Sequence, residues 1–397
     1  MKPSEKHFKK LILTILGDVV LFAAFILTFC WFHHAGKMLG FTGKNVTVPT
    51  EEVIAKPSPS ATEKQTTPAV TPTGAALPTG QEQPGLTSAP TATPLPTPTP
   101  ECDENGVPYD FSGDFGAKFG KLFSADNSIV TDDTSYRSHD VYIKMSAFDG
   151  NLSQRTSKGA ERFAQSHTVW YAFDVYVRNI ENFFTSYSRS GEKQFYALYK
   201  DTSFGNAVAA INGDLFLYYD ETKKVIVRNG SVIRTSDYIV DDICVLYWDG
   251  TMEIETHDTY DWNRIKERAP YQIWSFGPSL IAPDGSVNKC YDSVIWIKNP
   301  RAAVGMVEPG HYVLLAVAGY RADAQRAVNG DGITLEAVGE LMASLGCKVA
   351  YNLDGGASVY AGFNGKELFH VTNANGSTRT ISDILCIGEC IGKDGAE

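Results

Sequence analysis

A long stretch without aromatic residues limits where this chain can fold. No Phe, Trp or Tyr occurs between Thr42 and Pro108, and 12 of the 19 prolines fall between Pro49 and Pro100. Proline fixes φ and cannot continue a helix or a central strand, so such a stretch cannot build a hydrophobic core. We therefore expect Asn45–Glu101 to be an extended, disordered linker that reaches at most about 170 Å as a polyproline II rod.

An apolar segment precedes the linker. Leu11–Phe32 would be about 33 Å long as a helix, enough to cross a hydrocarbon core of about 30 Å, and Asp18 is its only charged residue. Four lysines lie before Leu11, which predicts a transmembrane helix with its N-terminus in the cytoplasm. A cleaved signal peptide is the alternative, but its apolar core is usually about 7–15 residues long, shorter than this segment.

These features divide the chain into four parts. They are a basic cytoplasmic tail (1–10), a transmembrane helix (11–32), a juxtamembrane segment with the linker (33–108), and an extracellular domain (109–397). The first 50 residues carry a net charge of +4, which leaves −15 on residues 51–397. A domain this acidic lacks the excess of Lys and Arg that phosphate neutralisation needs, so no nucleic-acid partner is expected.

The extracellular part reads as one α+β domain, rich in sheet and poor in helices. Its apolar runs are β-branched or aromatic and are separated by Gly-containing turns, as in hairpins. The predicted strands are Thr168–Val177, Val225–Val227, Val232–Ile233, Ile243–Trp248, Met252–Ile254, Ala302–Met306, Tyr312–Ala318 and Lys348–Leu353.

One amphipathic helix stands out, Thr334–Leu345, bracketed by Gly332 and Gly346. Its 3.6-residue period predicts an inward face. That face consists of Leu335, Val338, Leu341, Met342 and Leu345.

The cysteines suggest packing more than metal binding. Cys244, Cys347 and Cys386 lie in apolar contexts, where a free thiol packs as a small hydrophobic group. No Cys-x-x-Cys pair accompanies them, so a structural zinc is not expected. A disulfide that includes Cys386 or Cys390 is left open.

Polar residues at strand ends carry the chemical signal. Ala210–Phe216 (AINGDLF) and Tyr351–Ser358 (YNLDGGAS) each lead from apolar residues into an Asn- or Asp-containing Gly turn. Such a turn lets a rigid sheet present side chains at its edge and lets a ligand approach the backbone closely. Asn299-Pro300-Arg301 and Ser275–Leu280 (SFGPSL) add two further polar segments.

Together these segments resemble the phosphodiester glycosidase family, over roughly Asn206–Gly388. The resemblance includes NPRAAVG, the helix and strand that end in NLDGGAS, and the closing segment RTISDIL. It implies hydrolysis of sugar-1-phosphodiesters; the family's namesake activity removes N-acetylglucosamine from mannose-6-phosphate diesters. A glycan or sugar-phosphate substrate is therefore the expected partner, besides the membrane.

Hydrolysis at an anomeric carbon needs a carboxylate to activate water or stabilise the oxocarbenium ion, and a cation for the leaving phosphate. We expect Asp354, Asp214 and Asn212 in the catalytic set, and Arg301 and Arg321 as phosphate forks. Other substrate contacts are expected from Thr334, Gly355, Gly356 and Ser358.

Purely structural roles remain open for several of these residues. Asp354 could cap its turn, Asn212 could form an Asx turn, and Arg301 could make a surface ion pair. No cofactor is required by the sequence, although Asp354 and Asp214 could supply oxygen ligands to a divalent metal.

The chain also departs from the family pattern. Ala318 stands where an Asp-Gly-Arg segment usually begins, Ala337 where Glu is common, and Ala357 where a third Gly is usual. Two functions are therefore considered. The first is a membrane-anchored extracellular hydrolase that cleaves glycosyl-1-phosphodiester bonds in cell-wall or exopolysaccharide glycopolymers. The alternative is a catalytically impaired surface module that binds sugar phosphates.

Overall fold

The computed structural model describes residues 52–53, 113–188, 191–214, 224–320, 327–328, 331–373 and 375–390. The predicted membrane helix Leu11–Phe32 and most of the predicted linker lie outside these ranges. Within the ranges, no helix is both long and apolar enough to cross a membrane. Glu52–Val53, at the start of the predicted linker, forms the short strand β1, which pairs antiparallel with β9 (Ser231–Arg234).

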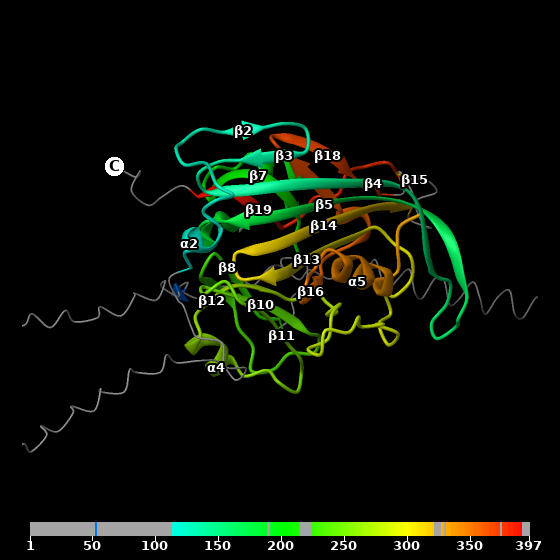
Figure 1. Ribbon diagram of the computed structural model, residues 1–397. Coiled ribbons are helices and arrows are strands. Elements are labelled where there is room, and N and C mark those ends of the chain that lie inside the picture. The colour runs from blue at the N-terminus through cyan, green and yellow to red at the C-terminus, as the bar shows by residue number, and fades with distance from the viewer. Residues whose placement is uncertain are drawn as a thin grey trace, which may run out of the picture. The chain divides into compact units, whose positions relative to one another are not determined.

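Three sheets make up the described structure (Figure 1). The largest has eight strands, in the order β16-β13-β14-β5-β4-β3-β2, with β15 also paired to β14. Their bounds are β2 Val130–Thr131, β3 Ser135–Arg137, β4 Val141–Arg155, β5 Phe163–Val177, β13 Arg301–Glu308, β14 His311–Tyr320, β15 Ala327–Val328 and β16 Val349–Asn352.

The two smaller sheets complete the fold. A six-stranded sheet has the order β1-β9-β8-β12-β10-β11, and a five-stranded sheet has the order β18-β17-β7-β19-β6. The remaining bounds are β6 Phe183–Tyr187, β7 Gly205–Asn212, β8 Ile226–Arg228, β10 Ile243–Tyr247, β11 Met252–Glu255, β12 Pro270–Trp274, β17 Tyr360–Phe363, β18 Lys366–His370 and β19 Asp383–Cys390.

Strand β14 shows why the large sheet is central. Successive side chains of a strand point to opposite faces. In β14, Leu314 and Ala316 enter a core shared with strands of both smaller sheets, whereas Val313 and Leu315 pack against the layer that contains helix α5. The run is apolar throughout because both faces are covered.

The helices are few and mostly short. They are α2 (Gly116–Phe119), α3 (Phe195–Tyr199), α4 (Trp262–Glu267) and α5 (Leu335–Ser344), with 3-10 turns at Ile180–Asn182 and Gly356–Ser358. Helix α5 packs against β13 and β16 of the large sheet. Each predicted strand is found within two or three residues of its expected bounds, except that β5 begins at Phe163, earlier than expected. The predicted helix is confirmed as α5, with Thr334 as its N-cap.

The inward face of α5 is partly different from the prediction. Leu335, Val338 and Met342 are fully buried, as expected, but Leu341 and Leu345 are only partly buried at the edge of the contact. Gly339 faces inward instead, and a Cβ on it would come within 2.8 Å of the Leu280 carbonyl oxygen. Close approach to the 280–287 segment therefore rotates the buried face away from the two leucines.

The thiols Cys244, Cys347 and Cys386 are free and buried, as predicted for packed cysteines. A disulfide through Cys386 is therefore not formed. Cys290, for which no role was predicted, is also free and buried.

Strands β4 and β5 form an unusually long hairpin. They pair over all 15 residues of each strand, from Val141–Val177 to Arg155–Phe163. Figure 1 shows the hairpin extending past the end of β14 and curving toward the side on which α5 lies. This extension, residues 149–168, is called the arm below.

Candidate active site

The two Gly turns predicted from the sequence meet in the structure. Asn212 ends β7, and its side-chain amide donates to the carbonyl oxygens of Asp354 (2.7 Å) and Gly213 (3.2 Å). The backbone N–H of Asp354 donates in turn to the Gly213 carbonyl oxygen at 3.2 Å. Asn212 is 1% exposed and uses its amide to join the turns, which is a positioning geometry.

Asp354 has the surroundings of a functional carboxyl group. It is buried, and burial raises its pKa above the ordinary value, an effect that Ser358 and Arg379 only partly oppose. Arg379 Nη1 lies 3.9 Å from Oδ2. The buried Ser358 hydroxyl acts on the Asp354 carboxyl group as a hydrogen-bonding neighbour, and neither Asp354 Oδ2 nor Ser358 Oγ forms a hydrogen bond of normal geometry with another described group. Buried polar atoms are nearly always fully paired, so these two neighbouring oxygens have capacity for a further hydrogen-bond partner.

A second cluster, made of Arg228, Asp214 and Asp383, adjoins the Asn-Gly turn. Arg228 is fully buried between two carboxylates: Nη2 bonds Asp214 Oδ1 at 2.5 Å, and Nε bonds Asp383 Oδ2 at 3.0 Å. Asp214 Oδ2 also accepts from the Ser275 N–H at 2.7 Å. Two carboxylates share one cation here. Burial is the main cause that raises the pKa of Asp383, to about 7, and Asp214 adds to it.

This cluster changes what can be expected of Asp214. Both of its oxygens already accept hydrogen bonds from protein groups, and the residue is 2% exposed. Both oxygens of Asp214 are thus already bound by protein groups, whereas Asp354 Oδ2 has only the long Arg379 contact, and a catalytic role of Asp214 stays a prediction.

Three residues near the site were not predicted from the sequence, namely Arg228, Arg379 and Asp383. Two of them belong to RTISDIL, a segment that the sequence marked only as a closing strand. Gly213 is required here because a Cβ on it would overlap Asp383 Oδ1 at 2.2 Å.

Arg301 begins β13 and is 1% exposed, so a surface ion pair is excluded. Its Nε donates to the Ile333 carbonyl oxygen at 3.3 Å, and its Nη2 donates to the carbonyl oxygens of Ile295 and Ile297. No carboxylate within the described residues pairs with it, and burial lowers its pKa to about 10. Its Nη1 lies 3.8 Å from the position that a Cβ on Gly355 would take. The structure thus holds an unneutralised cation beside the Asp-Gly-Gly turn.

The structure explains why glycine occupies positions 355 and 356 of the turn and why Thr334 precedes α5. Gly356 has φ +63, a conformation that favours glycine, and a Cβ on Gly355 would lie 2.7 Å from the Pro300 carbonyl oxygen. Thr334 Oγ1 accepts from the Ala337 N–H at 3.2 Å and caps α5. Arg321, the second predicted phosphate fork, lies outside the described residues.

The departures from the family pattern are also buried. Ala318 is 1% exposed and Ala337 is 3% exposed. Glu336, next to Ala337, is bound by Arg155 Nε at 3.0 Å, so its carboxylate is directed at the arm. Among the described residues, no group of three or more His, Cys, Asp or Glu side chains is arranged to hold a metal ion.

Residues 205–388, just under half of the chain, match the sequence profile of the phosphodiester glycosidase family. This segment carries the sequence profile of a phosphodiester glycosidase domain. The match spans both turns, Arg301, α5 and most of β19, so the resemblance seen in the sequence is confirmed.

The domain also resembles individual proteins. The SPbeta prophage-derived uncharacterized protein YomE of Bacillus subtilis is 23% identical over 273 residues, which cover 66% of this chain. The match spans only 40% of the length of YomE. Among solved structures, the zebrafish N-acetylglucosamine-1-phosphodiester alpha-N-acetylglucosaminidase catalytic domain, auto-inhibited by its pro-peptide, is 18% identical with a TM-score of 0.46. That match covers 62% of this chain and 83% of the zebrafish chain. A hypothetical protein from Synechocystis matches at 12% identity and a TM-score of 0.37, over 66% of this chain and 64% of its own.

Proposed function

We propose that this protein hydrolyses glycosyl-1-phosphodiester bonds in cell-wall or exopolysaccharide glycopolymers. The observation that carries the proposal is the buried Asp354 carboxyl group, which lies between the Ser358 hydroxyl and Arg379 and has capacity for a further hydrogen bond at Oδ2. It lies in a domain of the phosphodiester glycosidase family. An anionic sugar ester would supply this further hydrogen-bond partner.

The proposed reaction breaks the bond between the anomeric carbon and the phosphate oxygen. Water attacks the anomeric carbon, one of its protons passes to Asp354 Oδ2, and the bonding electrons leave with the phosphate. The products are a free sugar and a phosphate monoester. A raised pKa makes the Asp354 carboxylate a better base for this step, and Arg379 at 3.9 Å favours its ionised form.

The leaving phosphate carries negative charge, so a fixed cation stabilises the transition state. Arg301 fits this role through Nη1, which lies near Gly355, while its other nitrogens are fixed by backbone carbonyl groups. A guanidinium held in this way needs no reorganisation when the charge develops. Arg321 is kept as a second proposed phosphate ligand, and a divalent metal stays a prediction.

The membrane anchor and the extracellular location belong to the same proposal. They rest on the apolar segment Leu11–Phe32, the lysines before it and the Pro-rich stretch after it. A spacer of this kind suits a hydrolase that acts on polymers at some distance from the membrane.

The test is release of free sugar by the purified full-length protein. The substrates are UDP-N-acetylglucosamine and a synthetic N-acetylglucosamine-1-phosphate methyl diester, assayed over a range of pH with and without divalent ions. Sugar release that saturates with substrate supports the proposal. No release under any of these conditions contradicts it.

A second candidate is a sugar-phosphate-binding module without turnover. It is favoured by the burial of Ala318 and Ala337 at positions where the family often has acidic groups, and by the pairing of Glu336 with Arg155. Saturable binding of the methyl diester, measured by calorimetry, without any release of sugar would identify this function.

A further inference from the structure

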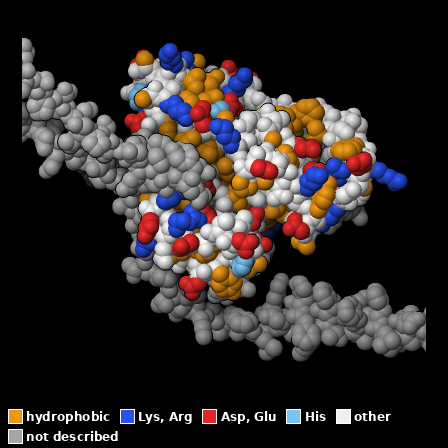
Figure 2. Space-filling model, turned by 60° about the horizontal axis from the view of Figure 1, so that its bottom comes forward, with side chains coloured by type: hydrophobic (Ala, Val, Ile, Leu, Met, Phe, Trp, Pro, Cys, Tyr) orange, Lys and Arg blue, Asp and Glu red, His pale blue; other side chains and the backbone are white. Residues whose placement is uncertain are grey.

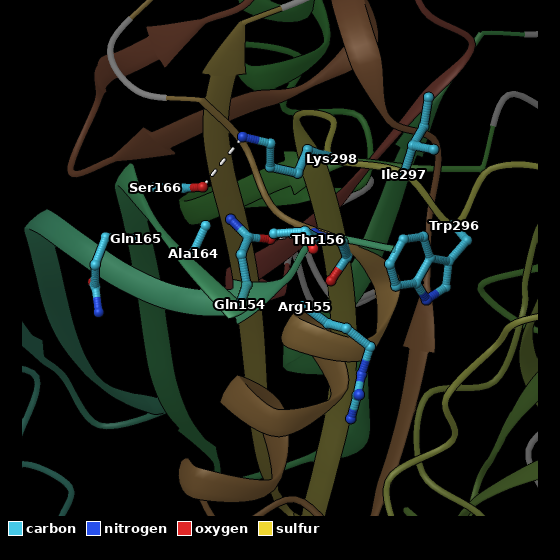
Figure 3. Close-up of a pocket in the computed structure, with 10 residues that line it drawn as sticks. Gln154, Arg155, Thr156, Ala164, Gln165, Ser166, Trp296, Ile297 and Lys298 are labelled. Carbon is cyan, nitrogen blue, oxygen red and sulfur yellow. Dashed lines mark hydrogen bonds between the residues drawn. The ribbon is translucent and has the colours of Figure 1, made fainter. Parts of the chain in front are cut away.

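A pocket of about 410 Å³ lies at the base of the arm. Its walls come from three parts of the chain: the arm strands β4 and β5, the segment before β13, and the start of α5 (Figure 3). The lining residues are Gln154, Arg155, Thr156, Ala164, Gln165, Ser166, Trp296, Ile297, Lys298 and Thr334. Apart from Thr334, none of them was predicted as a site residue.

Arg301 connects this pocket to the proposed active site. Its Nη2 donates to the carbonyl oxygens of Ile295 and Ile297, and its Nε donates to that of Ile333. Those residues belong to, or adjoin, two of the three parts of the wall, namely the segment before β13 and the start of α5. Its Nη1 lies 3.8 Å from the position that a Cβ on Gly355, the residue after Asp354, would take. One guanidinium therefore links the backbone that carries the pocket lining to the Asp-Gly-Gly turn.

The pocket lining contains no carboxylate side chain. Lys298 Nζ donates to Ser166 Oγ at 3.2 Å, and its nearest acid in the described structure, Asp331, is 4.0 Å away. Figure 3 shows Lys298 extending toward Ser166, with Trp296 on the opposite side. The Arg155 side chain points along α5, and its guanidinium pairs with Glu336. Among the described residues Lys298 forms only the long ion pair with Asp331, and its side chain is exposed, so of the two lining cations it is the one that can turn to a ligand.

The polar groups suit a sugar ring with a charged substituent. Trp296 is 3% exposed, and its indole N–H has no hydrogen-bond partner within the described ranges. Thr156, Gln165 and Ser166 add hydroxyl and amide groups to the lining. Binding pockets typically combine an aromatic wall with a few polar groups that fix the orientation of the ligand.

We propose that this pocket is the aglycone subsite and that it binds a saccharide carrying a phosphate group. With the scissile phosphate at Arg301 and its sugar at Asp354, the group on the other side of the phosphate extends toward Lys298. The preferred substrate is then a polymer in which a second phosphate follows the first after one sugar. The assignment of a phosphorylated saccharide to this pocket rests on the proposed hydrolysis, whereas the existence of the pocket does not depend on it.

The experiment compares three N-acetylglucosamine-1-phosphodiesters that differ only in the aglycone: methyl, N-acetylglucosamine, and N-acetylglucosamine bearing a phosphomonoester. We expect kcat/KM to increase in that order. The phosphomonoester should add about tenfold, the effect of one charge-assisted hydrogen bond, and added salt should reduce this gain. Lys298→Gln should abolish the gain, whereas Lys144→Gln, at an exposed position of β4, should retain it.

Equal kcat/KM for the neutral and the phosphorylated sugar aglycone would overturn the subsite, as would the same gain in Lys298→Gln and Lys144→Gln. If none of the three compounds is hydrolysed, the proposed function fails and the subsite is judged by binding. Calorimetry should then show about tenfold tighter binding of the phosphorylated diester than of the neutral one, with this difference lost only in Lys298→Gln. Equal affinities would reject the subsite.

Discussion

The carboxyl group of Asp354 provides the sharpest test at the scale of single residues. Asp354→Asn keeps the size of the side chain and the turn geometry but removes the charge. We expect the turnover number to fall at least about 100-fold, the lower end for acid–base catalysis, with little change in Tm. Asp284→Asn is the matched control, because Asp284 lies in an exposed turn where its side chain accepts only from Ser286.

Turnover by the Asp354→Asn variant at the wild-type rate would show that Asp354 only shapes its turn. A fall in Tm with unchanged activity per folded molecule would lead to the same conclusion.

The raised pKa of Asp383 predicts how the free energy of unfolding depends on pH. Its folded-state pKa is raised to about 7, so the folded protein holds a proton that the unfolded chain releases near pH 4. The stability that this proton contributes is complete below the unfolded-state pKa and is lost as pH rises through about 7. Between pH 5 and pH 7 the free energy of unfolding should therefore decrease, by at most about 1.4 kcal/mol per pH unit for one proton.

Asp383→Asn should remove this part of the pH dependence, because the amide stays neutral beside Arg228 and Asp214. Urea unfolding of both proteins at several pH values measures the difference. Identical slopes in the variant and the wild type would mean that another group holds the proton.

At the scale of elements, substitutions in helix α5 can show which of its side chains stabilise the fold. Met342 is fully buried against β13 and β16, whereas Leu341 is only partly buried. Met342→Ala should cost about 2–5 kcal/mol of unfolding free energy. Leu341→Ala should cost clearly less, below about 2 kcal/mol, since less apolar area is lost. Denaturant unfolding of the two variants compares them, and equal costs would contradict the observed orientation of the helix.

The sequence predicted long apolar strands well and short helices poorly. Strands β13 and β14 could be found because their residues are apolar on both faces and a Pro-Gly turn separates them. Helices α3 and α4 have five and six residues, too few to show a 3.6-residue period. The buried face of α5 was partly misassigned because a pattern of large apolar residues cannot reveal a close contact made through Gly339.

The site was predictable only where its residues are close in the sequence. The Asp-Gly-Gly and Asn-Gly turns carry local signals, and the structure joins them through Asn212. Arg228 and Asp383 meet across 155 positions, so no local pattern could pair them. The pocket is formed by three distant segments for the same reason.

At the scale of the whole molecule, Figure 2 shows one face of the described residues. On this face acidic and basic side chains are mixed with apolar patches. Although residues 51–397 carry a net charge of −15, that face is therefore not uniformly acidic. Such a surface suits a domain that recognises its substrate within a site more than through long-range attraction, since screening limits exposed charges to about 10 Å.

The orientation of the whole chain in the membrane follows from its N-terminal charges. The lysines before Leu11 predict that the N-terminus stays in the cytoplasm and the domain faces outward. A protease added to intact cells should then cut within Asn45–Glu101, where exposed backbone without secondary structure is expected, and release a domain of unchanged activity. Immunoblotting of the medium and the cells with an antibody against the domain measures this release. Replacement of the four lysines at positions 2, 6, 9 and 10 by glutamine should lower the released fraction, because the charge bias that sets the orientation is removed. A domain that stays protected in intact cells but is cut after lysis would mean that the chain is inserted in the opposite orientation.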